Sequence, residues 1–192
     1  MTLPYLIALL PYTAASAIVF AIGVVAGVIA LAAIPEAAAG VESSIAEFVS
    51  FAHGLGPLGL FVFIVVNNVV KAAVMMVLGI AFGLVPILFL VSNGIVLAVA
   101  AALIAEREGT LVAVAGLLPH GILELPAVLL AAAAGLRLGA AALERTRHPG
   151  RDIRMEMLAA WRVFAALIVP LLVVAAIVET TVTPLILMLT RG

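Results

Sequence analysis

Between Leu58 and Ala105 the sequence runs for 48 residues with a single charged side chain, Lys71. One helix of that length would measure about 72 Å, because an α-helix rises about 1.5 Å per residue. The hydrocarbon core of a bilayer is about 30 Å thick, so one straight helix would overshoot it more than twofold. The run therefore predicts a hairpin of two membrane spans. Its turn is expected where glycines and a proline cluster, in Gly79 to Pro86.

The remaining sequence is also strongly apolar. Hydrophobic residues make up 67% of the 192 residues, charged residues make up 10%, and the mean hydropathy is +1.41. A water-soluble domain needs a surface that is about a quarter charged. The composition therefore predicts an integral membrane protein of the all-α class, a polytopic transmembrane helix bundle. About five spans are expected in a single domain, over residues 13–34, 58–80, 83–105, 111–134 and 159–179.

The start of the chain contains two prolines before the first span. Pro4 and Pro11 are expected to keep the stretch "LPYLIALLP" from joining that span as one helix. The run of residues 13–34 is long enough to cross the bilayer, and no positively charged segment precedes it. We therefore expect a span here rather than a cleaved signal peptide.

The charged loops predict the orientation. The segment after the first span carries glutamates but no Lys or Arg, and apolar residues at helical spacing predict an amphipathic surface helix over residues 42–53. The loop of residues 144–157 is strongly basic. Because basic loops stay in the cytoplasm, we expect a multi-pass protein of the plasma membrane with a cytoplasmic amino terminus and an outer carboxyl tail.

Three pairs of glycines have the spacing that allows close helix crossings. They are "GVVAG" at 23–27, "GIAFG" at 79–83 and "GLRLG" at 135–139. Packing within one chain is the favoured interpretation, and an oligomer interface is the alternative.

Polar side chains from three expected spans fall near one depth of the membrane. A charged group at the helix centre costs about 2.5–3.5 kcal/mol on insertion scales, so pairing is economical. We hypothesise that Lys71 and Glu124 neutralise each other inside the bundle. The predicted polar layer consists of Asn67, Asn68, Lys71, Asn93, His120 and Glu124.

The fourth span is expected to be broken at Pro119–Gly121, and Pro126 is a further structural break. Irregular backbone at membrane depth survives only where protein or a water cavity satisfies it, and secondary transporters build binding sites in this way. Structural interpretations stand beside this one. The asparagines are more often interhelical hydrogen-bonding groups than ligand contacts, His120 would cap free carbonyls, and the ion pair would be structural.

Other chemistries have little support. One His and one Glu cannot make a zinc site, which needs three or four ligands, and the chain has no cysteine. No nucleophile elbow or phosphate-binding glycine loop is present. We expect no enzyme activity, no metal, no cofactor and no nucleic-acid partner.

Five stretches, in order between residues 57 and 184, resemble the stage II sporulation protein M family. They are "NN" before Lys71, "NG" at 93–94, "PHGILELPA" at 119–127, "AAGLRLG" at 133–139 and "AAIVETTVTP" at 175–184. The resemblance implies a helical membrane protein of five or six spans. In spore formers the namesake works in a complex with peptidoglycan-remodelling proteins, but that role is not carried over. The family's motifs fall on Asn67, Asn68, Asn93, His120, Gly121, Glu124, Pro126, Gly135, Gly139, Glu179, Thr183 and Pro184. Lys71 is the position that the resemblance supports least as a family feature.

Glu179 lies near the outer end of the last expected span. The favoured interpretation is a helix that ends at the interface, at Pro184. In the alternative the tail "PLILMLTRG" turns back into the membrane, and Glu179 faces the polar layer as a further binding candidate.

Two function classes follow. In the first, the protein is a permease-like or channel-like bundle that binds a small solute or ion in the polar layer. In the second, it is a non-catalytic scaffold or accessory subunit with a membrane-protein partner. Beyond the lipid bilayer, the expected partner is a second copy of the chain, as a homodimer.

Overall fold

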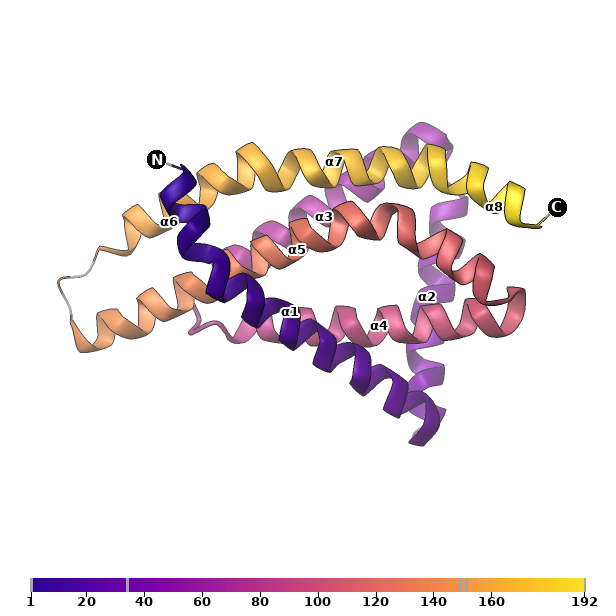
Figure 1. The fold of residues 1–192 in the computed structure, drawn as a ribbon, viewed down its shortest axis with the longest axis horizontal. Helices are drawn as coiled ribbons and strands as arrows, with labels where there is room; N and C mark the ends of the chain where they lie inside the picture. The colour runs from indigo at the N-terminus through magenta and orange to yellow at the C-terminus, as the bar shows by residue number, and fades with distance from the viewer. Residues whose placement is uncertain (1, 34, 149, 151, 192) are drawn as a thin grey trace.

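The computed structural model describes residues 2–33, 35–148, 150 and 152–191, and the described residues are mostly helical, with no strand among them. The helices α1 to α5 are followed by one long helix in which two π-helical turns, η1 and η2, separate α6, α7 and α8 (Figure 1). The bounds are α1 Thr2–Ala33, α2 Pro35–His53, α3 Pro57–Leu78, α4 Leu84–Glu108, α5 Thr110–Arg147, α6 Ile153–Val163, η1 Phe164–Ile168, α7 Val169–Ile177, η2 Val178–Val182 and α8 Thr183–Arg191.

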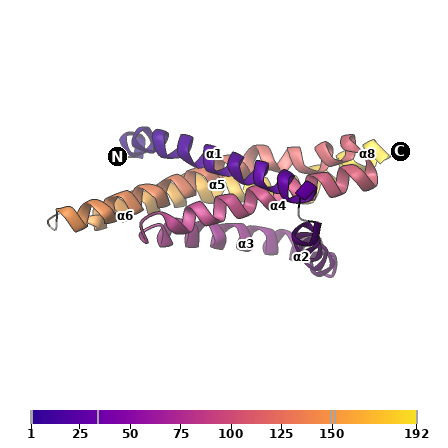
Figure 2. The same cartoon turned by 90° about the horizontal axis from the view of Figure 1, so that it is seen from below.

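Five described segments are long and apolar enough to cross a membrane, which confirms the expected number of spans. The hairpin turn lies at residues 79–83, inside the expected region. The two ends of the chain lie at opposite ends of the bundle, as an odd number of crossings requires (Figures 1 and 2). The segments are Leu3–Ala33, Pro57–Leu78, Leu84–Glu108, Gly121–Arg147 and Ile153–Thr190.

The expected separation of the amino-terminal stretch from the first span is wrong. α1 is one helix of 32 residues with Pro11 inside it. Tyr5 and Leu9 from this stretch are buried in the core, so tertiary packing holds the first turns in line with the rest. A proline removes one backbone hydrogen bond, whereas ending the helix in an apolar surrounding would leave several backbone groups unsatisfied.

The expected amphipathic helix is present and begins earlier than residue 42. α2 crosses the end of the bundle, at a wide angle to the long helices (Figure 1). The Glu42 carboxylate of α2 accepts a hydrogen bond from Arg107 at the end of α4. The ring of Phe51 packs edge-on against the ring of Phe63 of α3, with 5.2 Å between the ring centroids. These contacts attach α2 to the end at which α4 stops and α5 starts.

All three glycine pairs pack within the chain. A Cβ on Gly23 would come within 2.5 Å of the Val91 carbonyl oxygen, and one on Gly94 within 2.5 Å of the Phe20 carbonyl oxygen. The turn after α3 meets α5 in the same way, since a Cβ on Gly79 would overlap the backbone of Gly135. The glycines therefore set the close α1–α4 and α3–α5 crossings of one molecule.

The expectation that Pro184 ends the last helix is wrong, and so is the alternative that the tail turns back. The helix continues from Ile153 to Arg191 through two π-helical turns. η1 ends two residues before Pro170, and η2 ends two residues before Pro184. A proline ring clashes with the carbonyl four residues earlier, which lies in the π turn in both cases. The wider turn makes room for the ring, so the helix bends instead of stopping.

The break expected at Pro119–Gly121 takes the form of a bend, because α5 stays helical through both Pro119 and Pro126. Figure 1 shows α5 arching along its length, with its amino-terminal part turning toward the end of α4. The later part of α5 lies at the centre of the bundle, where Ala131 to Ala134 are fully buried. α5 therefore forms the core of the bundle with its later half, while its earlier half arches over α4 from the turn that joins the two helices.

Candidate functional site

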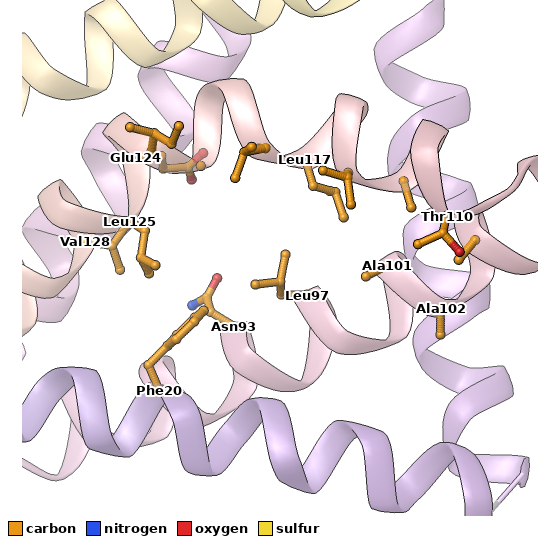
Figure 3. Close-up of a pocket in the computed structure, with 16 residues that line it drawn as sticks. Phe20, Asn93, Leu97, Ala101, Ala102, Thr110, Leu117, Glu124, Leu125 and Val128 are labelled. Carbon is orange, nitrogen blue, oxygen red and sulfur yellow. The ribbon is translucent and has the colours of Figure 1, made fainter. Parts of the chain in front are cut away.

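A large cavity lies between α4 and the bent half of α5, with α1 contributing its floor. Its volume is about 760 Å³, and it is partly open to the surroundings (Figure 3). Apolar side chains form most of the wall. The lining residues are Phe20, Asn93, Leu97, Ala101, Ala102, Ala105, Thr110, Ala113, Val114, Leu117, Leu118, Gly121, Ile122, Glu124, Leu125 and Val128. We call this cavity the apolar groove.

Two local features of the sequence keep the groove wide. Pro119 and Pro126 lie inside α5, where each removes a backbone hydrogen bond and crowds the preceding turn, which bends the helix. Small residues also face the groove: Ala101, Ala102 and Ala105 from α4, and Gly121 from α5. A Cβ at Gly121 would have no neighbour within 4 Å among the described residues, so the space beside this glycine is open.

A second, smaller pocket of about 50 Å³ lies where α3, α4 and α5 meet. Four residues of the predicted polar layer line it together: Asn68, Lys71, Asn93 and Glu124. The remaining wall is apolar and consists of Ala72, Met75, Phe89 and Val128. We call this the polar pocket, and it is just large enough for one or two water-sized groups.

The two cavities are adjacent, because Asn93, Glu124 and Val128 line both. Figure 3 shows the side chains of Glu124 on α5 and Asn93 on α4 pointing toward each other across the space between the helices. The polar pair therefore stands at the inner end of the groove. Asn93 lies about 14 Å along α4 from Leu84, at the helical rise per residue.

Hydrogen bonds fix the direction of the asparagines. The Asn93 Nδ2 donates to the Phe89 carbonyl oxygen at 2.7 Å, which turns its Oδ1 away from its own backbone. The Asn67 Nδ2 donates to the Asn68 Oδ1 at 3.0 Å. Asn67 is not among the described residues that line the polar pocket, so its contribution is to orient Asn68.

The charged pair lies on the wall of one pocket. Lys71 is exposed in the single chain, and Glu124 is half-buried. Lys71 is seven residues before the end of α3, about 10 Å along the axis, so its amine can reach toward the nearer end of the bundle. The proposed neutralisation of Lys71 by Glu124 stays a prediction.

Of the two remaining candidates, Glu179 lies apart from this group. Glu179 falls in η2 and is not among the described residues that line either cavity. The neighbouring hydroxyls of Thr180 and Thr181 donate to the Ala176 and Ile177 carbonyl oxygens at 2.8 and 2.6 Å, which supports the backbone of the π turn. The backbone of His120 belongs to α5, but its side chain lies outside the described residues.

The sequence reasoning missed a polar cluster at the other end of α5. Arg137 donates through Nε and Nη2 to the Glu156 carboxylate of α6, and the Nη2 distance to Oε2 is 3.3 Å. Its Nη1 donates to the Ala8 carbonyl oxygen at 3.1 Å, and its guanidinium lies 4.9 Å from the centre of the Tyr5 ring. Arg137 sits alone among small apolar residues on α5, a pattern that marks a buried cation in need of a partner.

In the part of the chain that the structure describes, no three His, Asp or Glu side chains lie close enough together to hold a metal ion.

The sequence model of the family described as "Stage II sporulation protein M" matches residues 16–184, which is most of the chain. No curated protein and no solved structure matches it.

Proposed function

The chain belongs to the stage II sporulation protein M family and is an integral membrane protein, and from this premise we propose that it is a permease-like bundle whose polar pocket binds a small solute or ion. One observation carries the proposal: Asn68, Lys71, Asn93 and Glu124, from three different helices, converge on one pocket at the inner end of a large groove. Binding sites of membrane transporters are built from such groups beside bent or broken helices. The proposal includes no catalytic step.

The groove gives this pocket a route of access. It runs from the turn between α4 and α5, near Ala105 and Thr110, to Asn93 and Glu124. The polar pocket continues from there toward Lys71, which lies nearer the opposite end of the bundle. The series of cavities therefore follows the direction that a transported solute would take.

For the orientation, we propose a plasma-membrane protein with its amino terminus in the cytoplasm. The connection that follows α5, with Arg145 and Arg147 before it and Arg154 after it, lies at the same end of the bundle as the amino terminus (Figure 1). Basic residues next to spans stay on the cytoplasmic side. The groove would then open toward the outside.

Native mass spectrometry of the protein, extracted gently from its own membranes, tests the proposal. The wild type should carry a bound small molecule or ion that Glu124→Gln loses while it remains folded. Glu47→Gln is the matched control, since Glu47 is exposed on α2, away from both cavities. The same spectra report the oligomeric state, for which a homodimer remains our prediction.

The scaffold function is the competing proposal. This proposal needs no bound solute, because asparagines and an ion pair can also serve to hold helices in register. A second protein at fixed stoichiometry, retained by Glu124→Gln, together with no bound small molecule in the wild type, would replace the permease proposal with this one.

A further inference from the structure

The apolar groove is large, and polar side chains line it only near its two ends. Its volume of about 760 Å³ falls within the range of roughly 300–1,000 Å³ typical of small-molecule sites. Among the described residues that line it, Thr110 lies at one end, and Asn93 and Glu124 lie at the other. Between these ends the walls of α4 and α5 are aliphatic. Water in this middle part would lack polar partners, so the space suits hydrocarbon.

The groove opens along its side. Val114, Leu118 and Ile122 follow one another at four-residue spacing on the α5 wall, and 50%, 56% and 61% of their surfaces are exposed. This exposed stripe runs along the helix for about 12 Å, at the helical rise per residue. A groove that opened only at its end would bury these side chains. Because the facing wall, α4, is a membrane-spanning segment, the long mouth of the groove faces the hydrocarbon of the bilayer.

The length of the groove matches one leaflet of the membrane. Its α4 wall extends from Ala105, next to the charged end of the helix, as far as Asn93. This wall is about 18 Å long, at the helical rise per residue. The hydrocarbon core of a bilayer is about 30 Å thick, so one leaflet contributes about 15 Å. A lipid chain from the leaflet on the α2 side can therefore lie along the whole groove and end beside Asn93.

The size of the groove decides between a lipid chain and a helix of a second copy. A helix 18 Å long and about 10 Å across, side chains included, occupies about 1,400 Å³. This is nearly twice the volume of the groove. A hydrocarbon chain is thinner than a helix, and it is flexible enough to follow the bend of α5. Filling is favoured because an empty groove would leave its walls without contacts on one side.

We infer that the apolar groove is a lipid-binding site, in which one hydrocarbon chain of a membrane lipid lies lengthwise between α4 and α5. The lipid enters sideways from the leaflet on the α2 side, and its chain ends next to the polar pocket. The inference goes beyond the proposed function and does not rest on it, since the chain fills the groove whether or not the polar pocket binds a solute. A solute that uses this route passes only after the chain has left.

Photolabelling tests the inference on the full-length protein in phosphatidylcholine vesicles. The probe is a phosphatidylcholine that carries a diazirine in the middle of one chain. Labels should be about tenfold more frequent on the groove residues of α4 and α5 than on Val25, Val28 and Ile29, which corresponds to a preference of about 1.4 kcal/mol over the surrounding bilayer. Those three residues are the reference because they are exposed apolar residues of α1 outside the groove.

An obstructed groove provides the decisive variant. Ala101→Trp places a large ring halfway along the α4 wall, so a chain can no longer lie along the groove, and labelling of the groove residues should fall about tenfold. Val96→Trp is the matched control, because Val96 is an exposed residue of α4 that is not among the described lining residues. Its labelling should equal that of the wild type. Ala101→Leu obstructs the groove more mildly and replaces Ala101→Trp if that variant does not fold.

Native mass spectra of the same proteins, extracted in a mild detergent, count the bound lipids. The wild type, Val96→Trp and Glu124→Gln should each keep one lipid per chain that Ala101→Trp loses. Equal labelling of groove and α1 residues, or a lipid that Ala101→Trp retains, overturns the lipid site. Loss of a second copy of the chain from Ala101→Trp, in place of a lipid, overturns it in favour of a protein interface. The proposed function fails by a different result, namely that Glu124→Gln loses no solute.

Discussion

Arg137 of α5 and Glu156 of α6 form an ion pair in which both side chains are largely buried, with 23% and 14% of their surfaces exposed. The pair also touches α1, through the Ala8 carbonyl and the Tyr5 ring. The first helix, α1, and the consecutive helices α5 and α6 are therefore fixed to one another at the end of the bundle where the chain begins. This cluster stabilises the fold at one end of α5, while the other end of α5 bends to form the groove.

Replacing Glu156 by Gln should lower the free energy of unfolding by about 3 kcal/mol, because it leaves the Arg137 charge buried without a carboxylate. Thermal unfolding in one detergent measures the change. The matched control is Glu42→Gln, whose partner Arg107 is 67% exposed and whose own side chain is 37% exposed. That exposed pair should contribute no more than about 1 kcal/mol. Equal effects of the two variants would contradict the assignment.

Gly79→Ala should be destabilising by about 1–3 kcal/mol, because the added methyl group meets the backbone of Gly135 and forces the helices apart. The same unfolding measurement applies. Gly40→Ala is the control, since a Cβ there has nothing within 4 Å, and the helix propensity of alanine should stabilise it by up to about 1 kcal/mol. A neutral Gly79→Ala would show that the α3–α5 contact is looser than the structure has it.

Removing the bend of α5 should increase the distance between the two ends of this helix. The chain has no cysteine, so spin labels can be placed at Thr110→Cys and Ala140→Cys without background. A straight helix would separate these two α-carbons by about 45 Å. In Pro119→Ala/Pro126→Ala, pulsed electron paramagnetic resonance should give a longer distance, closer to that value, than in the parent. Pro184→Ala should leave the distance unchanged, and an unchanged distance in the double variant would remove the prolines as the cause of the bend.

Lys71 and Glu124 should be energetically coupled. Glu124→Gln should lower stability by about 1–3 kcal/mol, and Lys71→Met should partly restore it, since the double variant buries no charge. A double-mutant cycle of unfolding free energies measures the coupling, which we expect between about 0.5 and 3 kcal/mol. Lys71→Met combined with Glu47→Gln is the additive control. Additivity in the main cycle would count against the pair.

Cysteine accessibility on intact cells should report the orientation. Ser44 of α2 and Thr146 at the end of α5 are both exposed. If the basic loop lies in the cytoplasm, as we propose, a membrane-impermeant maleimide should label Ser44→Cys before lysis and Thr146→Cys only after lysis. The opposite pattern would invert the topology and place the groove opening inside the cell.

The sequence by itself determined the class of this protein, the number of its spans and the site of the α3–α4 turn. These features follow from hydropathy and charge, which are properties of each residue and add along the chain. Family motifs and the cost of burying polar groups also predicted that Asn68, Asn93 and Glu124 would lie together. Local sequence is sufficient to predict these features because every span must cross the same thickness of bilayer, so the position of a residue along its span sets its depth.

Only the tertiary structure decided what the prolines and the isolated charges do. Pro11 and Pro184 continue their helices, and Pro119 bends one, because the packing around each determines which backbone groups can be satisfied. Arg137 pairs with Glu156, 19 residues away, because α5 and α6 approach each other closely. The groove exists because the earlier half of α5 arches over α4 while the later half stays in the core. These outcomes depend on contacts between distant segments, which no local pattern in the sequence specifies.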